Sequence, residues 1–290
     1  MSWRIVEVQN RAKLDYRLGY MEVRKEKPLR IHLSEISMLI IESTEVSITA
    51  SLLNELAKAK VKVIFCDEKR NPAFEIMSYY GSHDSTEKIR TQIQWSDAVK
   101  GQVWTSIVYE KIKKQAETLE ALHLTGAELL YSYLEEMEFG DRTNREGLAA
   151  KSYFSSLFGS NFSRSYDIDI NKCLNYGYSI LLSAFNREVV SNGYLTQLGL
   201  FHDNMFNYFN LSCDLMEPFR PIVDQFVYRL APSKFESAEK LALVNLMNQE
   251  IIIGEKRQTI NNAIKIYSKS VFDAINERDT SLLRFYRNEL

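Results

Sequence analysis

GSHDST, residues 81–86, separates two stretches of the chain whose side chains follow different patterns. Glycine, serine and aspartate in close succession are typical of a turn or linker. Before this segment, apolar and polar side chains alternate as they do in strands. The strand-like runs are residues 3–8, 13–23, 31–42, 61–67 and 74–80. They predict a small β-rich domain at residues 1–82.

Beyond the linker the pattern is helical. Ser96 is a candidate N-cap, and Val99, Val103 and Ile107 follow it at helical spacing. Further helices are predicted over residues 175–190, 237–251 and 259–275. At roughly 150 residues per domain, a chain of 290 residues suffices for two domains. We therefore predict an α+β fold in which a larger all-α domain occupies residues 83–290.

The composition excludes a uniformly basic nucleic-acid-binding protein. Lysine and arginine total 36 against 38 for aspartate and glutamate, which gives a formal net charge of −2. A site for a polyanion would therefore have to be a local patch of positive charge. Cys66, Cys173 and Cys213 are far apart and lack disulfide or metal-ligand spacing, as expected in the reducing cytoplasm. The sequence has no signal peptide and no membrane-spanning run, so we expect a cytoplasmic protein without membrane contact.

TNREGLAAKSYF, residues 143–154, has the pattern of a helix start. Thr143 and Glu146 fit the S/T-x-x-E capping box, in which each side chain accepts a hydrogen bond from a free backbone N–H. Capping explains the glutamate but not Gly147, because glycine in the first turn of a helix costs up to about 1 kcal/mol relative to alanine. Small residues beside a carboxylate leave room for another group to approach it. A helix cap and a functional acid therefore both stay open for Glu146.

His202 lies among amides and aromatic side chains in QLGLFHDNMFNYFN, residues 197–210. A single histidine in such a stretch is more often a hydrogen-bonded packing residue than a ligand. The chemical character of the stretch does not decide between the two.

CDLMEPFRP, residues 213–221, places Asp214 and Glu217 on one helical face. Ser212 is a candidate cap for this helix, and the default role of Asp214 is a first-turn acid facing the helix dipole. Pro218 predicts either a kink or a helix that begins at the proline.

Glu146, His202 and Glu217 would form a set with chemical meaning if they met in the fold. Oxygen-rich sites suit Mg²⁺ and Mn²⁺, and an imidazole favours tolerance of Mn²⁺. Such metals polarise a phosphodiester and activate an oxygen nucleophile. The spacing alone does not show that the three side chains converge.

Other sequence signals of catalysis are missing. The sequence contains no phosphate-binding loop, no nucleophile elbow and no H-E-x-x-H zinc motif. The charged run KIKKQAETLE, residues 111–120, is interpreted as an ordinary solvated helix face, because Lys113 and Glu117 are spaced as a surface pair.

Four segments occur in an order and at separations that resemble a known family. They are NREGLAAKSYF (144–154), LNYGYSILLSAF (174–185), GLFHDN (199–204) and DLMEPFRP (214–221). Together they resemble the CRISPR-associated endonuclease of the spacer-acquisition step, often called the CRISPR integrase, over the chain up to about residue 230. YGSHDS, VIFCDEKR and the EPFRP form of the last motif are similar to the type II-A-like subgroup.

The resemblance implies roles for individual residues. Glu146, His202 and Glu217 match the family's catalytic metal ligands, and the implied metal is Mg²⁺ or Mn²⁺. Asp214 occupies a neighbouring acidic position that could support the metal or the bound DNA. With Glu146 as a ligand, Gly147 would let a phosphate backbone come close.

The resemblance also implies partners and a reaction. Family members form homodimers, and a dimer of a small ferredoxin-like adaptation protein bridges two of them into a heterohexamer; further type II-A adaptation proteins could take part. The β-rich domain would serve dimerisation and partner contacts, and the helical domain catalysis, in a prokaryotic cytoplasm. The substrates are double-stranded DNA: a spacer precursor, whose 3′-hydroxyl attacks a phosphodiester near the leader–repeat boundary of the CRISPR array.

Arginines flank these motifs and could grip phosphates in a bidentate manner. They are Arg142, Arg145, Arg164, Arg187 and Arg220. An individual arginine is more often a surface or ion-pairing residue, and Arg145 and Arg220 are the better candidates. The alternative to an enzyme is a non-catalytic helical scaffold or DNA-binding module, in which Glu146 is a cap and His202 a core residue.

Overall fold

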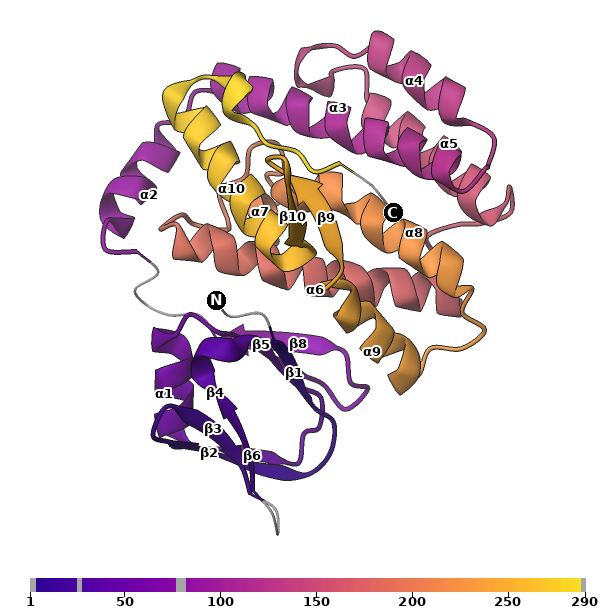
Figure 1. Ribbon diagram of the computed structural model, residues 1–290. Helices are drawn as coiled ribbons and strands as arrows, with labels where there is room; N and C mark the ends of the chain where they lie inside the picture. Colours follow the sequence, from indigo (N-terminus) through magenta and orange to yellow (C-terminus); the bar gives the residue numbers. More distant parts are fainter. Residues whose placement is uncertain (1–3, 25–27, 77–81, 288–290) are drawn as a thin grey trace. The chain divides into compact units, whose positions relative to one another are not determined.

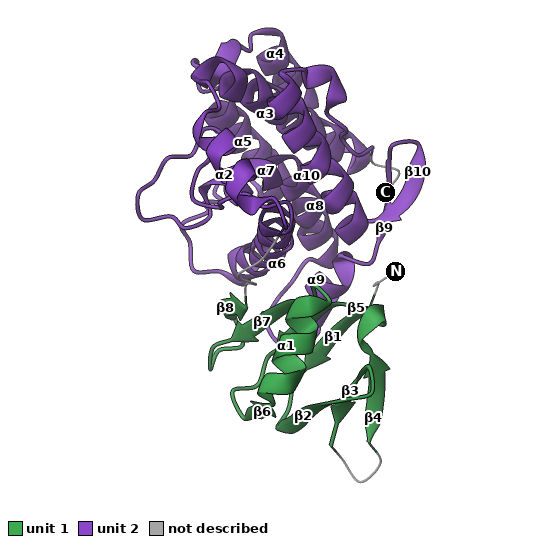
Figure 2. Ribbon diagram, turned by 90° about the vertical axis from the view of Figure 1, so that its left-hand side faces the viewer, with its two compact units in different colours: residues 1–81 green, residues 82–290 purple. Residues whose placement is uncertain are grey.

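The computed structural model describes residues 4–24, 28–76 and 82–287 of the chain. The chain forms two compact units, Met1–Gly81 and Ser82–Leu290, which Figure 2 shows in green and purple. The first unit is rich in strands and the second is built mostly of helices, which confirms the predicted α+β class. The roles assigned to the two domains stay predictions.

The first unit contains two four-stranded sheets. The strands are β1 (Arg4–Val8), β2 (Ala12–Arg17), β3 (Tyr20–Val23), β4 (Leu29–His32), β5 (Ile36–Ile41), β6 (Val46–Ile48), β7 (Lys62–Cys66) and β8 (Pro72–Ile76). One sheet has the order β1-β5-β7-β8, in which only β8 is antiparallel to its neighbour. The other has the order β4-β3-β2-β6 and is built on the β2–β3 hairpin. Of the strand predicted over residues 74–80, the last four residues lie outside the described residues.

One apolar core joins both sheets to helix α1 (Ala50–Lys58). Leu14 and Met21 enter it from one sheet and Leu39 from the other, while Leu52 comes from the helix, and all four are fully buried. The run ISMLII of β5 is buried along its whole length, which is typical of a central strand of a parallel sheet.

The second unit consists of helices packed around two long ones, α3 and α6. The helices are α2 (Ser85–Ile93), α3 (Asp97–Ala121), α4 (Ala127–Glu135), α5 (Arg145–Phe158), α6 (Asp169–Ser191), α7 (Asn210–Met216), α8 (Arg220–Leu230), α9 (Ser237–Leu246) and α10 (Ile260–Glu277). Helices α7, α8 and α10 contact both α3 and α6, and they lie between the two in Figure 1. Ser96 caps α3 as predicted, because its side chain accepts the N–H of Val99 at 3.4 Å. In the described part of the chain, every helix is too short or too polar to cross a bilayer.

The helical unit also contains a small two-stranded sheet that the all-α prediction omitted. It pairs β9 (Glu250–Ile253) with β10 (Lys256–Thr259) in antiparallel register. The turn consists of Gly254 and Glu255, which both have positive φ (57° and 64°), as a two-residue hairpin turn of this kind requires. Three successive isoleucines favour a strand here, so the helix predicted over residues 237–251 ends early.

The C-terminal segment belongs to the core of the helical unit. Tyr286 is fully buried, and its hydroxyl donates to the carbonyl of Pro218 at 3.0 Å. Its ring packs on Phe219 with centroids 4.9 Å apart, and the Lys114 ammonium lies 4.9 Å from the ring centroid. This segment therefore supports the bend at Pro218, next to Glu217.

We expect Tyr286→Ala to lower the free energy of unfolding by about 3–5 kcal/mol, because it leaves a cavity the size of an aromatic ring in a packed core. Tyr286→Phe keeps the ring and removes only the hydrogen bond to Pro218, which is worth about 1 kcal/mol. Urea titration followed by circular dichroism measures both losses. Tyr166→Ala, at an exposed tyrosine of the same unit, is the control and should change stability by less than about 0.5 kcal/mol. Equal losses for all three variants would contradict this role of the C-terminal segment.

Candidate active site

Helix α5 presents Glu146 as its second residue, but the predicted Thr143–Glu146 capping box is wrong. The cap is Asn144, in the left-handed region with φ of 53°, where asparagine is tolerated. The Asp141 carboxylate accepts the backbone N–H groups of Arg145 at 2.7 Å and of Glu146 at 3.0 Å. Because another acid already satisfies these donors, the side chain of Glu146 is not needed for capping.

Gly147 makes room for the cap. The Asn144 side chain accepts the N–H of Gly147 at 3.3 Å. A Cβ at Gly147 would lie only 2.8 Å from Oδ1 of Asn144 and 2.9 Å from Nδ2. The glycine is therefore explained by the Asn144 amide that fills the neighbouring space, rather than by the predicted approach of a phosphate backbone.

Glu217 is positioned by a break between two helices. Helix α7 ends at Met216, residues Glu217–Phe219 form a 3₁₀ turn, and α8 begins at Arg220. Pro218 lacks an N–H and cannot continue the α-helical hydrogen bonds, so the predicted kink is confirmed. The side chain of Glu217 is only 3% exposed.

Two expectations for α7 are wrong. Ser212 does not cap a helix, because it lies inside α7 and is fully buried. Asp214 lies beyond the first turn of a helix that begins at Asn210, and it is fully buried as well. Both residues face the interior because α7 packs between α3 and α6.

Lys111 joins the two acids. Its Nζ atom lies 2.5 Å from Oε1 of Glu146 and 2.5 Å from Oε2 of Glu217. On its other oxygen, Glu217 pairs with Nε of Arg220 at 3.0 Å. Three elements far apart in sequence, α3, α5 and the turn after α7, thus bring two carboxylates to a single cationic group.

The charges of this cluster hold one another ionised. Burial alone would lower the pKa of Lys111, but the Glu217 and Glu146 carboxylates raise it above its usual value. Burial would likewise raise the pKa of Glu217, but Lys111 and Arg220 hold it below its usual value. Lys111 and Glu217 are therefore both charged at neutral pH.

His202 is held by Asp214. The Nδ1 atom of His202 lies 2.5 Å from Oδ1 of Asp214, which also accepts the backbone N–H of His202 at 3.1 Å. The other oxygen, Oδ2, accepts the N–H groups of Leu200 at 2.6 Å and Phe201 at 3.1 Å. A single buried carboxylate thereby fixes both the loop and the imidazole.

The imidazole itself stays accessible. The side chain of His202 is 38% exposed, and it lies edge-on to the rings of Trp104 and Phe201, with centroids 5.8 Å away in each case. The hydrogen bond to Asp214 raises the pKa of His202, and the carboxylates of Glu217 and Glu146 raise it further. The histidine therefore shares the electrostatic environment of the two acids.

The donor chemistry of the site suits a divalent cation, although the two acids contact a lysine. Two carboxylates and an imidazole are donors that suit Mg²⁺ or Mn²⁺. In residues 4–24, 28–76 and 82–287, however, no three His, Cys, Asp or Glu side chains are arranged as a ready-made ligand set. Glu146 and Glu217 converge instead on the Lys111 ammonium, which stands in for a metal as their shared cation.

The prediction that the run KIKKQAETLE forms an ordinary solvated face is wrong for two of its lysines. Lys111 and Lys114 are both buried. The signal was present: Lys111 lies four residues after Ile107 and so continues the apolar stripe of α3. A lysine in such a stripe needs a buried partner.

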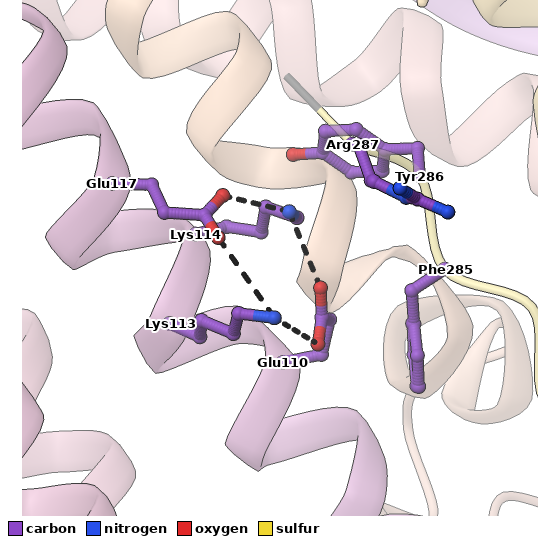
Figure 3. Close-up of a pocket in the computed structure, with 7 residues that line it drawn as sticks. All are labelled: Glu110, Lys113, Lys114, Glu117, Phe285, Tyr286 and Arg287. Atoms are coloured by element: carbon purple, nitrogen blue, oxygen red, sulfur yellow. Dashed lines mark hydrogen bonds and ion pairs between the residues drawn. The ribbon is translucent and has the colours of Figure 1, made fainter. Parts of the chain in front are cut away.

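Lys114, the other buried lysine of this run, lines a pocket whose lining does not include Glu146 or Glu217 (Figure 3). Lys114 pairs with Glu117 at 2.7 Å and with Glu110 at 3.3 Å. The pocket has a volume of about 450 Å³, and its remaining lining residues are Lys113, Phe285, Tyr286 and Arg287. The charged groups that α3 contributes to this pocket pair with one another, and Lys114 also lies over the ring of Tyr286 in the C-terminal segment.

The arginines proposed as DNA contacts divide into two groups. Arg220 and Arg164 lie on the ring of Tyr178, with guanidinium carbons 4.9 Å and 5.4 Å from its centroid, and Arg220 also pairs with Glu217. Arg164 instead donates to the side chains of Asn171 and Asn175, at 2.6 Å in each case.

The other arginines make local contacts. Arg145 pairs with the exposed Glu136 at 2.6 Å, and Arg187 pairs with its neighbour Glu188 at 2.7 Å. Arg142 lies over the ring of Phe139. Contact with DNA stays a prediction for every arginine named.

Comparisons with known proteins agree with this fold. The family model described as CRISPR associated protein Cas1 matches residues 6–246. CRISPR-associated endonuclease Cas1 of Neisseria meningitidis serogroup C (strain 8013) is 32% identical over 291 residues, covering 98% of this chain and 96% of the relative. Among solved structures, a casposase bound to integration product is similar with a TM-score of 0.77 and 17% identity, over 97% of this chain and 92% of that chain. A chain of a Cas6-RT-Cas1–Cas2 complex is similar with a TM-score of 0.73 and 15% identity, over 97% of this chain and 36% of that chain.

The two structural neighbours show that the fold is shared with a casposase and with a Cas1-containing complex. The extent of the family match and the identity to the Neisseria relative go further: the chain belongs to the CRISPR-associated Cas1 family. The predicted family is thereby confirmed, and relatives that are named endonucleases support a nuclease or integrase activity. The type II-A-like subgroup stays a prediction.

Proposed function

We propose that this protein is a divalent-metal-dependent DNA endonuclease and integrase that inserts new spacer DNA into a CRISPR array. The observation that supports this best is the convergence of Glu146 and Glu217, from separate helices, on one cationic position beside the accessible His202. Carboxylates brought together in this way repel each other unless a cation lies between them. In a member of the Cas1 family, we assign that position to Mg²⁺ or Mn²⁺.

Each protein group has a defined part in the proposed reaction. A divalent cation held by Glu146, His202 and Glu217 would polarise the scissile phosphodiester and stabilise the charge that develops on it. Asp214 engages Nδ1 of His202 and leaves Nε2 as the nitrogen available for coordination. Arg220 holds Glu217 from the side opposite to the shared position. The 3′-hydroxyl of the incoming DNA would attack a phosphodiester near the leader–repeat boundary, so that a new phosphodiester forms as the old one breaks and the 3′-oxygen of the cut strand leaves as a hydroxyl. Attack by water would give hydrolysis instead.

The surface next to His202 suits unpaired bases. Met205, Phe206 and Tyr208 lie in the same loop and are largely exposed. Aromatic faces of this kind stack on the bases of single strands regardless of sequence. We assign this loop to the end of the DNA strand that enters the site, with Arg164 and Arg220 as phosphate contacts.

The proposed assembly follows the structural neighbours. A chain of the Cas6-RT-Cas1–Cas2 complex shares this fold, and the casposase was determined with an integration product. We propose that this chain forms homodimers, that a dimer of a small ferredoxin-like adaptation protein joins two of them into a heterohexamer, and that the β-rich unit makes these contacts. Double-stranded spacer precursor and leader–repeat DNA are the proposed substrates.

Removal of the metal provides the first test. A short duplex with free 3′-hydroxyls should be joined to a supercoiled plasmid in the presence of Mn²⁺ and the adaptation partner. Addition of EDTA should reduce joining to background, and excess Mn²⁺ should restore it, because no protein group in the site can replace a divalent cation in polarising the phosphate. Joining that proceeds unchanged in EDTA would contradict the proposal.

The salt dependence of binding provides a second test. With a net charge of −2, DNA binding must rely on local contacts between arginines and phosphates, each of which releases counterions. The dissociation constant for a short duplex, measured by fluorescence anisotropy between 50 and 300 mM salt, should rise with a slope of about 0.9 logarithmic units per phosphate contact. A flat response would argue against a phosphate-dominated grip.

The alternative is a non-catalytic scaffold or DNA-binding module, and one observation favours it. Lys111 and Arg220 already neutralise the two carboxylates, as they would in a purely structural ion-pair cluster. A scaffold would bind DNA with the same salt dependence but would neither bind Mn²⁺ at these acids nor join DNA ends.

A further inference from the structure

The Lys111 ammonium occupies the position that a metal shared by Glu146 and Glu217 would take. Its Nζ atom is 2.5 Å from one oxygen of each acid. A metal bound to the same two oxygens and an ammonium at hydrogen-bond distance from both cannot be present together, because each needs the space between the carboxylates. The lysine is only 8% exposed, so it is built into the site rather than placed there by a mobile surface chain.

The balance of charges in this cluster also indicates that Lys111 and a metal ion exclude each other. Lys111 and Arg220 balance the charges of Glu146 and Glu217. A divalent cation added to these four groups would leave two surplus positive charges next to the buried side chains of Lys111 and Glu217, which is unfavourable. Phosphate groups of bound DNA would offset the surplus and accept the ammonium once it has left the carboxylates.

We propose that Lys111 is a built-in competitor of the catalytic metal, which holds the acids together in the free protein and is displaced from them when DNA and a divalent cation bind together. This inference rests on the metal site proposed above and adds its regulation. Metal and DNA then increase each other's affinity, because each relieves the charge that the other leaves unbalanced. The free protein would bind metal weakly, which would limit unwanted cleavage of cellular DNA.

Mn²⁺ binding tests the proposal, with electron paramagnetic resonance as a readout of free Mn²⁺ that does not depend on activity. Wild type, Lys111→Met and Glu146→Gln are titrated with and without a short duplex, and the signal from the duplex alone is subtracted to remove Mn²⁺ bound by DNA itself. Lys114→Met is the matched control, because this buried lysine of the same helix pairs with Glu110 and Glu117 instead. Without DNA, Lys111→Met should bind Mn²⁺ about tenfold more tightly than wild type or Lys114→Met. The duplex should tighten Mn²⁺ binding by wild type by about tenfold and by Lys111→Met much less.

The possible outcomes distinguish failure of the proposed competition by Lys111 from failure of the proposed metal site. If Lys111→Met binds Mn²⁺ no more tightly than wild type, while Glu146→Gln abolishes binding, the metal site stands and the competition is refuted. If neither wild type nor Lys111→Met binds Mn²⁺ at these acids, with or without DNA, the proposed function fails as well. Should Lys111→Met not fold in EDTA, two measurements remain. Its refolding on addition of Mn²⁺ is expected, and the effect of DNA on wild type, if absent, overturns the inference without any variant.

Discussion

Glu146→Ala and His202→Ala are each expected to reduce metal-dependent strand transfer at least about a hundredfold, because each removes one ligand of the proposed cation. The two residues come from different elements and are held by different partners. Loss of activity in both variants would therefore indicate that the two residues bind the same metal ion, rather than that one segment of the chain is damaged. The assay is joining of a short duplex to a supercoiled plasmid in Mn²⁺, quantified on a gel.

Matched variants separate this effect from misfolding. Glu146→Gln keeps the size of the side chain and can still accept a hydrogen bond from Lys111, so it should fold like wild type and yet be inactive. Glu128→Gln changes an exposed acid in the first turn of α4, and it should retain full activity. Near-normal joining by folded Glu146→Ala or His202→Ala would remove the basis for the metal assignment.

Asp214→Asn is expected to lower the free energy of unfolding by about 2–4 kcal/mol, because an amide nitrogen would replace one of two carboxylate oxygens that accept buried hydrogen bonds. In whichever orientation the amide takes, its NH₂ group faces donors instead of accepting from them. Oδ1 accepts the backbone N–H of His202 and is hydrogen-bonded to Nδ1 of its ring, and Oδ2 accepts the N–H groups of Leu200 and Phe201. Because the imidazole loses its orientation as well, strand transfer should fall by about 10–100-fold.

Thermal or urea unfolding and the joining assay measure the two effects of Asp214→Asn separately. Asp203→Asn changes an exposed acid in the same loop and should leave both quantities unchanged. If Asp214→Asn were as stable and active as Asp203→Asn, the buried carboxylate would not organise the loop.

Most of the fold could be predicted from local patterns of the sequence. The apolar patterns of the sequence predicted most strands of the first unit, but they did not predict β6, and the single run predicted over residues 31–42 is divided into β4 and β5 by a 3₁₀ turn at Leu33–Glu35. The cap at Ser96 together with the stripe from Val99 to Ile107 predicted the start of α3. These signals depend on neighbours along the chain, so they can be detected without knowledge of tertiary contacts. Pro218 likewise predicted a break, since a missing N–H interrupts any helix.

The parts of the site that escaped prediction depend on contacts between distant residues. Asp141 satisfies the backbone at the start of α5, and Tyr286 packs against the turn that holds Glu217. Neither role can be predicted from the spacing of residues along the sequence. Lys111 was interpreted as solvated because lysine is mostly exposed, although its place in the stripe of α3 indicated burial. The proposed roles of Glu146, His202 and Glu217 as metal ligands depend on resemblance to a family, because periodicity does not show whether distant residues meet.

The central claim is that Glu146 and Glu217 share one divalent cation with His202 beside bound DNA. The most direct measurement is anomalous diffraction from crystals of the protein with a short duplex and Mn²⁺. The account predicts a single manganese peak within bonding distance of both carboxylates and the free nitrogen of His202, with the Lys111 ammonium moved away from the acids. A manganese peak elsewhere, or none, with Lys111 still bridging Glu146 and Glu217, would contradict it.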